Sequence, residues 1–220
     1  MGKQENPERS AANYLPATLT IPSLRQAARS CQGCDLYQNA TQTVFGEGPE
    51  DAILMFIGEV PGDWEDRLGR PFVGPAGKLF DRTLEEAGLR RSECYLTNVV
   101  KHFKWKAHGK RRLVVKPAAR ENRACLPWLE AEIRILQPQM IVCLGATAGQ
   151  ALLGAEFRVT KQRGQVLQTH WAPWLMATVH PSMLLRIPDP DERVKAYHEF
   201  IADLEIAAAH YLEIKQAAHH

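Results

Sequence analysis

Residues 52–77 read AILMFIGEVPGDWEDRLGRPFVGPAG, and this stretch decides the fold that we expect. The first six residues are all hydrophobic and lie between polar residues and a glycine, a pattern typical of a strand buried on both faces of a sheet. The remainder is rich in glycine and proline and carries acids, arginines and aromatics, so it predicts a long loop. Such loops in compact domains are usually functional, and open α/β sheets bind ligands beyond the carboxyl ends of their strands. We therefore expect a functional site where this loop leaves the strand.

Three more hydrophobic runs alternate with helical patterns further along the chain. The expected strands lie over 94–100, 140–144 and 174–179, and the expected helices over 76–87, 118–136 and 190–211, with another helix opening at 145. Buried strands that alternate with helices predict a parallel sheet covered on both faces. The expected fold class is α/β, a three-layer αβα sandwich with a four-stranded, mostly parallel sheet.

The composition favours one soluble domain whose ligand surface is local. The 220 residues carry 27 Lys and Arg against 25 Asp and Glu, a formal net charge of +2. This balance excludes a basic nucleic-acid coat over the whole chain, so any DNA-binding surface must be confined to one region. No stretch of about eighteen apolar residues predicts a membrane span, and MGKQENPERS at the start lacks the apolar core of a signal peptide. We expect a cytoplasmic monomer with a flexible arm over 1–20, one domain over 21–212 and a tail over 213–220.

The five cysteines fall into two groups. Cys94 and Cys143 lie inside hydrophobic runs, as small buried side chains do. Cys31 and Cys34 form a C-x-x-C pair behind a short predicted helix, and Cys125 stands alone. The pair could hold a metal centre, act as a redox dithiol or be there by chance. A redox dithiol normally lies at a helix N-terminus, whereas this pair follows a helix, so the spacing favours a metal centre.

Four residues lie at or just beyond the carboxyl ends of the four predicted strands: Glu59, Asn98, Gly145 and His180. Because the carboxyl ends of parallel strands meet at one edge, we expect these residues to line one crevice. Asn98 is either a structural amide bonded to backbone or a group that points into a pocket, since a buried amide needs partners. His180, followed by a proline, is either a packing histidine or a side chain that projects into the site.

The segment 103–123 is basic and carries Phe103 and Trp105 among its cations, which are Lys104, Lys106, Lys110, Arg111, Arg112, Lys116, Arg120 and Arg123. A charge run is usually a solvated face. Aromatics among cations beside a strand end also favour contact with nucleic-acid phosphates.

Several motifs together resemble the uracil-DNA glycosylase superfamily, specifically its iron–sulfur, family 4-like enzymes, and within them the UdgX branch most closely. The resemblance extends over about residues 25–208. Its motifs are Gly58-Glu-Val-Pro-Gly62, Gly69-Arg-Pro-Phe-Val-Gly74, Leu96-Thr-Asn98, Lys101-His-Phe-Lys104, Lys110-Arg-Arg112, Cys125 with Pro127-Trp128-Leu129, Leu144-Gly-Ala146 and His180-Pro-Ser182.

The resemblance implies a DNA repair enzyme that flips uracil out of DNA and cleaves its N-glycosidic bond. Phe72 would stack on the flipped base, as aromatics do in base-flipping pockets, and Asn98 would bond the edge of uracil. His180 would bond uracil O2 and stabilise the charge of the leaving base, and Glu59 would lie under the sugar. The substrate pocket would also include the motif residues Gly58, Val60 and Gly62.

The resemblance also implies positions for DNA and for a cofactor. Candidate DNA contacts, which position the strand without reading its sequence, are Lys78, Lys110, Arg111, Arg112, Gly145, Ala146, Ser182 and Arg186. A [4Fe–4S] cluster would take the ligands Cys31, Cys34, His102 and Cys125, with His102 where the common family 4 pattern has a fourth cysteine.

Two departures from the UdgX pattern leave three functions open. Val60 stands where that branch usually has glutamine, and Val114 stands where it has the histidine that attacks deoxyribose and traps DNA covalently. Without that nucleophile, the first hypothesis is a glycosylase that hydrolyses the bond and leaves an abasic site. The second is a covalent uracil-DNA trap that uses His108 instead, and the third is a non-catalytic uracil-DNA-binding module.

Overall fold

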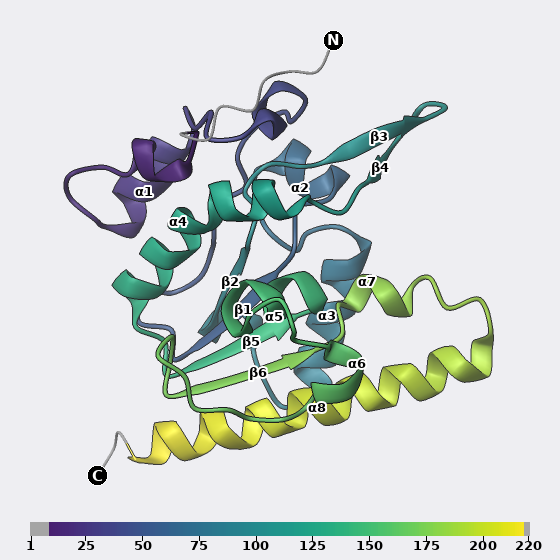
Figure 1. The fold of residues 1–220 in the computed structure, drawn as a ribbon. Coiled ribbons are helices and arrows are strands. Elements are labelled where there is room, and N and C mark those ends of the chain that lie inside the picture. Colours follow the sequence, from purple (N-terminus) through teal and green to yellow (C-terminus); the bar gives the residue numbers. More distant parts are fainter. Residues whose placement is uncertain (1–8, 218–220) are drawn as a thin grey trace.

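A four-stranded parallel sheet forms the centre of the computed structural model, which describes residues 9–217 (Figure 1). The strands are β1 (Leu54–Gly58), β2 (Cys94–Asn98), β5 (Met140–Leu144) and β6 (Trp174–Thr178), in the order β2-β1-β5-β6. All neighbouring strands are parallel. Every residue of β1, β2 and β5 is buried, which is why these segments are continuous hydrophobic runs.

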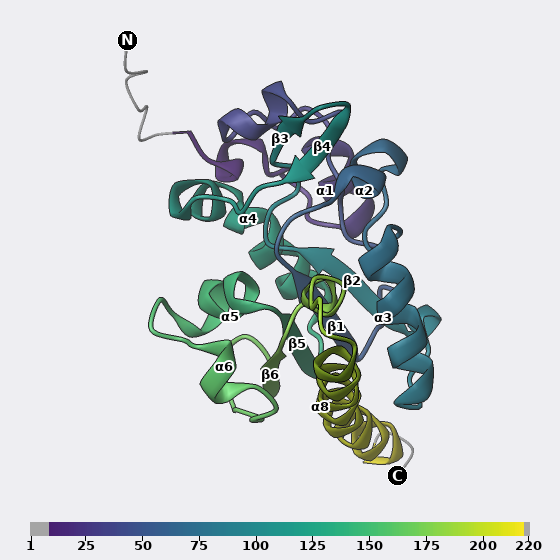
Figure 2. The ribbon, with the colours of Figure 1, turned by 90° about the vertical axis from the view of Figure 1, so that its right-hand side faces the viewer.

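Helices cover both faces of the sheet, so the predicted αβα sandwich is confirmed. One face packs against α1 (Ile21–Ala28), α4 (Ala119–Leu136) and α5 (Ala146–Leu153). The other packs against α3 (Pro75–Glu86), α7 (Pro181–Leu184) and α8 (Pro190–Ala217). Figure 2 shows α4 and α5 on one side of the strands and α3 and α8 on the other.

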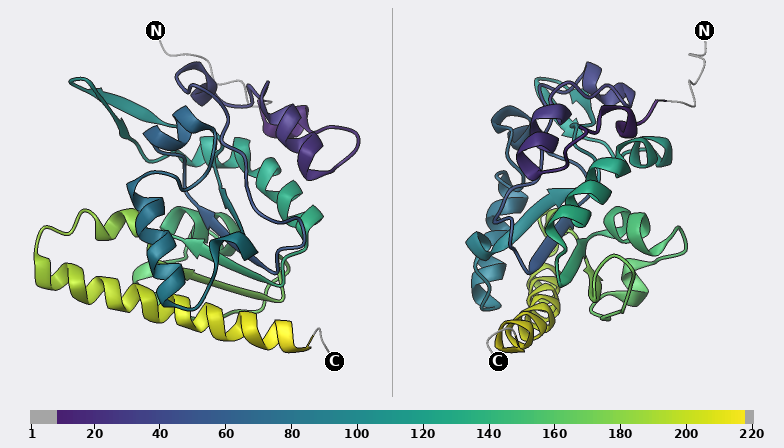
Figure 3. Two further views of the ribbon diagram at one scale, coloured as in Figure 1. Left: turned by 180° about the vertical axis from the view of Figure 1, so that it is seen from behind. Right: turned by 90° about the vertical axis from the view of Figure 1, so that its left-hand side faces the viewer.

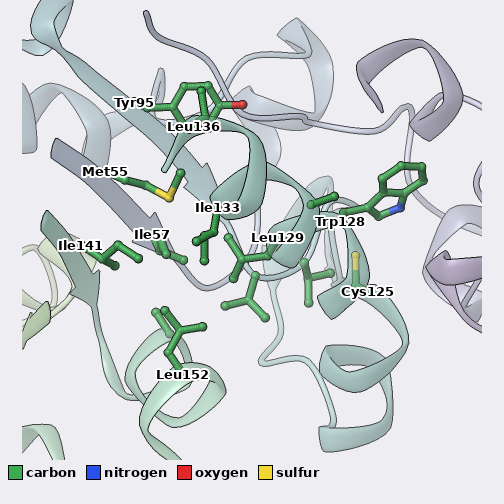
Figure 4. Close-up of a cluster of buried hydrophobic side chains, with 14 of the residues drawn as sticks. Met55, Ile57, Tyr95, Cys125, Trp128, Leu129, Ile133, Leu136, Ile141 and Leu152 are labelled. Carbon is green, nitrogen blue, oxygen red and sulfur yellow. The ribbon is translucent and has the colours of Figure 1, made fainter. Parts of the chain in front are cut away.

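Alternate strand residues build the two halves of the core. Met55, Ile57 and Ile141 face Leu129 of α4 and Leu152 of α5 (Figure 4). Their strand neighbours point to the opposite face, as the pleat requires; these include Leu54, Phe56, Met140 and Val142, which pack with Phe80 and Phe200. Cys94 and Cys143 are buried in the core, as expected.

Two elements differ from the sequence-based expectation. The predicted long loop after β1 contains a short helix, α2 (Asp63–Leu68), which begins after Gly62 and ends at Gly69 in the left-handed conformation. The basic segment forms an antiparallel hairpin of β3 (Trp105–His108) and β4 (Arg111–Val114), which turns at Gly109. The hairpin stands out from the body of the molecule (Figures 1 and 3).

The ends of the domain also differ from the boundaries that we expected. Within the predicted arm, a 3₁₀ helix over Ala11–Tyr14 lies against α4, and Ala11 is fully buried. At the other end, α8 continues to Ala217, beyond the predicted boundary at residue 212. Residues 1–8 and 218–220 lie outside the described residues. Shorter helical segments are Asp35–Gln38, Arg91–Glu93 and α6 (Val159–Gln162).

No helix within residues 9–217 is both long enough and apolar enough to cross a membrane.

Candidate active site at the carboxyl ends of the strands

The residues expected to line one crevice do lie together. Gly58 and Asn98 are paired in the register of β1 and β2. A Cβ atom on Gly58 would lie 2.3 Å from Asn98 Oδ1 and 2.7 Å from Phe72 Cζ, so only glycine leaves room for these two side chains. The rings of Phe72 and His180 are 6.1 Å apart between centroids and only 26° from parallel. Side chains from β1, β2, the loop after β1 and the end of β6 therefore converge.

The Asn98 side chain is buried but is not hydrogen-bonded within the described part of the fold. It is 3% exposed, yet among residues 9–217 its amide has no hydrogen-bond partner; the backbone carbonyl instead accepts from Lys101 Nζ at 2.8 Å. Buried amides that serve the fold are normally bonded within it. No side-chain hydrogen bond within the described residues supports the structural alternative for Asn98, and its Oδ1 lies beside the same point at Gly58 as the Phe72 ring.

His180 is held as a neutral imidazole. Its Nδ1 accepts from the backbone N–H of Ser182 at 3.1 Å and lies 2.8 Å from Ser182 Oγ. Burial, together with the positive charge of Arg186, lowers the pKa of His180 to about 4. Because Nδ1 accepts, the single proton of the neutral ring lies on Nε2. His180 thus presents one N–H donor to a ligand and carries no charge near neutral pH.

Glu59 supplies the carboxylate of the site, and a residue that the sequence did not single out holds it. Glu59 follows β1 directly and is partly buried. Its Oε1 accepts a hydrogen bond of 2.7 Å from Thr147 Oγ1, in the first turn of α5. In the sequence, the one signal for Thr147 was its position directly after Gly145-Ala146. Because threonine is common at the start of a helix, that position did not mark it as functional.

Phe72 has an unusual backbone that two further residues hold in place. Its φ angle is +55°, in the left-handed region that costs most residues energy. Arg91 donates to the carbonyls of Pro71 and Phe72 at 2.8 and 3.0 Å and is itself paired with Asp81. A Cβ on Gly77 would lie 2.0 Å from the Phe72 carbonyl oxygen, so Gly77 permits the close approach of α3.

Glu65 closes the loop that carries Phe72. This buried carboxylate of α2 accepts from the backbone N–H groups of Gly62, Val73 and Gly74 at 2.8 to 3.1 Å. It bonds the two glycine-containing ends of the loop to each other, which fixes Phe72 between them. Sequence reasoning missed Glu65 and Arg91, because each acts through hydrogen bonds to backbone groups, which leave no signal in the sequence.

Among the basic candidate DNA contacts, some are exposed to solvent and one is already paired with carboxylates of the protein. Lys78, Lys110, Arg111 and Arg186 are exposed beside the site or on the hairpin. Arg112, by contrast, is paired with Asp63 and with Asp66, the latter at 2.8 Å, and stacks on the Phe103 and Trp105 rings. Its charge is already matched by two carboxylates of α2. Through these two ion pairs Arg112 links the hairpin to α2.

Of the four residues expected to hold a cluster, Cys31, His102 and Cys125 are buried and Cys34 is partly exposed. Burial raises the pKa of the Cys125 thiol to about 12. Cys34 and Cys31 lie close enough to raise this pKa further. Each buried sulfur also faces a donor: Trp128 Nε1 lies 3.4 Å from Cys31 Sγ, and Lys101 N lies 3.3 Å from Cys125 Sγ. The neighbouring His102 is buried, which lowers its pKa to about 4 and keeps the imidazole neutral, as a ligand must be.

Within residues 9–217, no three His, Cys, Asp or Glu side chains are grouped so as to hold a single metal ion. In an iron–sulfur cluster each iron takes one protein ligand, so the ligands surround the cluster instead of meeting at one ion. Buried thiols that face N–H donors fit such a group, since hydrogen bonds to sulfur are one of the means by which proteins tune clusters.

Comparison with known proteins agrees with this geometry. The family model described as "Uracil DNA glycosylase superfamily" matches residues 45–205. A type-4 uracil-DNA glycosylase of Thermotoga maritima is 40% identical over 162 residues, which cover 73% of this chain and 81% of that protein. One from Archaeoglobus fulgidus is 35% identical over 182 residues, 80% of this chain and 88% of that protein. The match covers the strands and loops that carry Glu59, Phe72, Asn98 and His180, and the chain therefore belongs to the uracil DNA glycosylase superfamily.

Proposed function

We propose that this protein is a uracil-DNA glycosylase of the type-4 kind, which hydrolyses the N-glycosidic bond of deoxyuridine in DNA and leaves an abasic site. The observation that carries the proposal is the unsatisfied amide of Asn98, placed between Gly58 and Phe72 and near the neutral His180. The names of the relatives point to the same substrate.

The Asn98 amide selects uracil over cytosine by hydrogen-bond polarity. Uracil offers a carbonyl oxygen at O4 and a proton at N3, which match the N–H donor and the oxygen acceptor of one amide. Cytosine presents an amino group and an unprotonated nitrogen at the same places. The N–H donor of the amide would then face the amino donor, and the amide oxygen would face the acceptor nitrogen. A buried site rejects such a ligand strongly, because its polar groups are left unpaired. Phe72 supplies the flat apolar surface for the flipped base.

His180 and Glu59 act on the two fragments of the breaking bond. When C1′–N1 breaks, the electron pair moves onto uracil and spreads to O2, where the Nε2–H of His180 donates. The sugar develops positive charge, which the Glu59 carboxylate stabilises while it orients a water molecule. The water oxygen bonds to C1′, one water proton passes to Glu59, and the released uracil anion finally takes up a proton.

Charges around the pocket would position the DNA backbone. Ser182 bonds His180 and accepts from Arg186 at 3.3 Å, so phosphate contact at these residues would be coupled to the orientation of His180. The proposed contacts are Lys78, Lys110, Arg111, Ser182 and Arg186, with the backbone of Gly145 and Ala146. Arg112 is left out because α2 already holds it.

The proposal includes a [4Fe–4S] cluster held by Cys31, Cys34, His102 and Cys125. When bound, such a group supplies a rigid cross-link and no chemistry at the glycosidic bond. The chain residues themselves link this region to the site, since Lys101 N donates to Cys125 Sγ while Lys101 Nζ donates to the Asn98 carbonyl.

The hairpin geometry favours turnover over a covalent trap. Val114 pairs with Trp105 on the face of the hairpin that also carries Arg112, whereas His108 pairs with Arg111 on the opposite face. Three residues along the ladder, about 10 Å, also separate the two positions. His108 therefore cannot take the place of a nucleophile at Val114 unless the hairpin is rebuilt.

The proposal is tested with a uracil-containing oligonucleotide, single-stranded and in duplex, and with the same strands carrying cytosine. The wild-type protein should make alkali-labile sites only at uracil, and Asn98→Ala should lower the rate by at least about a hundredfold. A denaturing gel separates the outcomes: cut strands support the proposal, a shifted band that survives boiling supports the trap, and intact strands retained by the protein support a binding module.

A further inference from the structure

We propose that Thr147 is a positioning residue that fixes the Glu59 carboxylate for glycosidic cleavage, an inference that rests on the proposed function. The Thr147 hydroxyl donates to Glu59 Oε1 at 2.7 Å. Thr147 is 4% exposed, so its hydroxyl has few alternatives to this bond. Glu59 is partly buried, less so than Thr147.

The turn that presents Thr147 is fixed to both neighbouring strands. Gly145 adopts a φ of +96°, which lets the chain leave β5 and enter α5 within one residue. Its N–H donates to the Thr178 carbonyl of β6 at 2.8 Å, and a Cβ at Gly145 would lie 3.1 Å from the Cβ of His180. One rigid turn therefore contacts both proposed catalytic groups, Glu59 through Thr147 and His180 through Gly145.

The hydrogen bond uses one carboxylate oxygen and leaves the other open. Among residues 9–217, Glu59 Oε1 has Thr147 as its partner and Oε2 has none. A glutamate side chain has several rotatable bonds, and a group that acts on a reacting atom must be held close to its productive geometry. With Oε1 bonded to Thr147, Oε2 is the oxygen available to the water molecule or to the positive charge of the sugar.

A purely structural threonine makes a different prediction. If the hydroxyl only satisfied the fold, its removal would lower stability and would affect the enzyme equally with or without the Glu59 carboxylate. If it positions Glu59, its removal should lower the catalytic rate only while that carboxylate is present. The coupling between the two residues therefore distinguishes the roles.

The test uses Thr147→Val, which keeps the shape and removes the hydroxyl, and Thr147→Ser, which keeps the hydroxyl. Thr83→Val is the matched control, because among the described residues the Thr83 hydroxyl bonds only to the Phe80 carbonyl within α3, and Thr83 is also buried. In the full-length protein, T147V should lower kcat on uracil-containing DNA about ten- to a hundredfold with little change in KM. T147S and T83V should stay near the wild-type rate, and T147V should cause no further loss in a Glu59→Gln background.

Thermal melting of each variant shows that it is folded, and Thr147→Ala provides a second truncation if the valine variant melts early. If kcat is unchanged in T147V, or if the losses of kcat in T147V and E59Q multiply in the double variant, the positioning role of Thr147 is overturned. The proposed function would not be affected by either result. A wild-type protein that releases no uracil would overturn the proposed function first, and this inference with it.

Discussion

At the scale of single residues, the site depends on groups kept in an unusual state by their surroundings. Asn98 is buried without a partner, Phe72 has a left-handed backbone, and His180 is neutral because burial lowers its pKa. A left-handed backbone outside glycine costs free energy, and strained or perturbed residues of this kind are usual at functional sites. Asn98 and His180 were indicated by their positions at strand ends, and Phe72 by the family motif that contains it, but these signals did not reveal the state of each residue.

The lowered pKa of His180 predicts a loss of stability in acid. The unfolded chain takes up this proton near pH 6.5, whereas the folded protein takes it up only near pH 4. Between these values the unfolded state holds more protons, so the free energy of unfolding falls as the pH falls, by at most about 3 kcal/mol from this group. Urea unfolding at pH 7 and pH 4.5 should show a smaller pH effect in His180→Asn than in the wild type. Equal pH effects would mean that His180 is not buried as a neutral group.

At the scale of elements, α2 and the hairpin form one unit that was not expected. Neither has a clear sequence signature, because α2 has only six residues and the hairpin strands are mostly exposed and charged. Their link is Arg112, paired with Asp63 and Asp66 of α2. Through Glu65, the same helix fixes the loop that carries Phe72. The hairpin is therefore connected, through α2, to the loop that carries Phe72.

Loss of Arg112 should destabilise the fold. Asp66 is fully buried, so Arg112→Ala leaves its carboxylate without the partner that balances its charge. We expect the free energy of unfolding to fall by about 2 to 3 kcal/mol. Arg111→Ala, the neighbouring change on the exposed face, should alter stability by less than about 0.5 kcal/mol. If Arg112 instead served as a phosphate contact, R112A would keep its stability and would weaken DNA binding in a salt-dependent manner.

At the scale of the whole molecule, a buried ion pair connects the sheet, α4 and the site. Lys101 and Glu132 are almost completely inaccessible, and Glu132 also accepts from Tyr95, Thr97 and the Gly46 backbone. No sequence pattern indicated that Lys101 and Glu132 form a pair, because they are far apart along the chain. The four strands and long helices were predictable, because hydrophobic runs and helical periodicity are local signals. Partners such as Lys101–Glu132, Arg91–Phe72 and Thr147–Glu59 could not be predicted, because only the folded topology brings them together.

Removal of one partner of this pair should be costly. Lys101→Met leaves the Glu132 charge buried and should lower the free energy of unfolding by about 3 to 5 kcal/mol. The double variant Lys101→Met/Glu132→Leu should lose less than the sum of the two single changes, because no charge is left without its partner. Urea unfolding of the four proteins gives the coupling directly. Additive losses would show that the two side chains do not stabilise each other.

The central claim is that residues at the carboxyl ends of the four strands form one active site, which cleaves uracil from DNA with multiple turnover. The most direct measurement is the amount of free uracil set free from a large excess of uracil-containing single-stranded DNA, expressed per molecule of protein. We predict that many equivalents are released by the wild type and almost none by Glu59→Gln. A yield that stops at one equivalent, or no uracil at all from the wild type, would contradict the account.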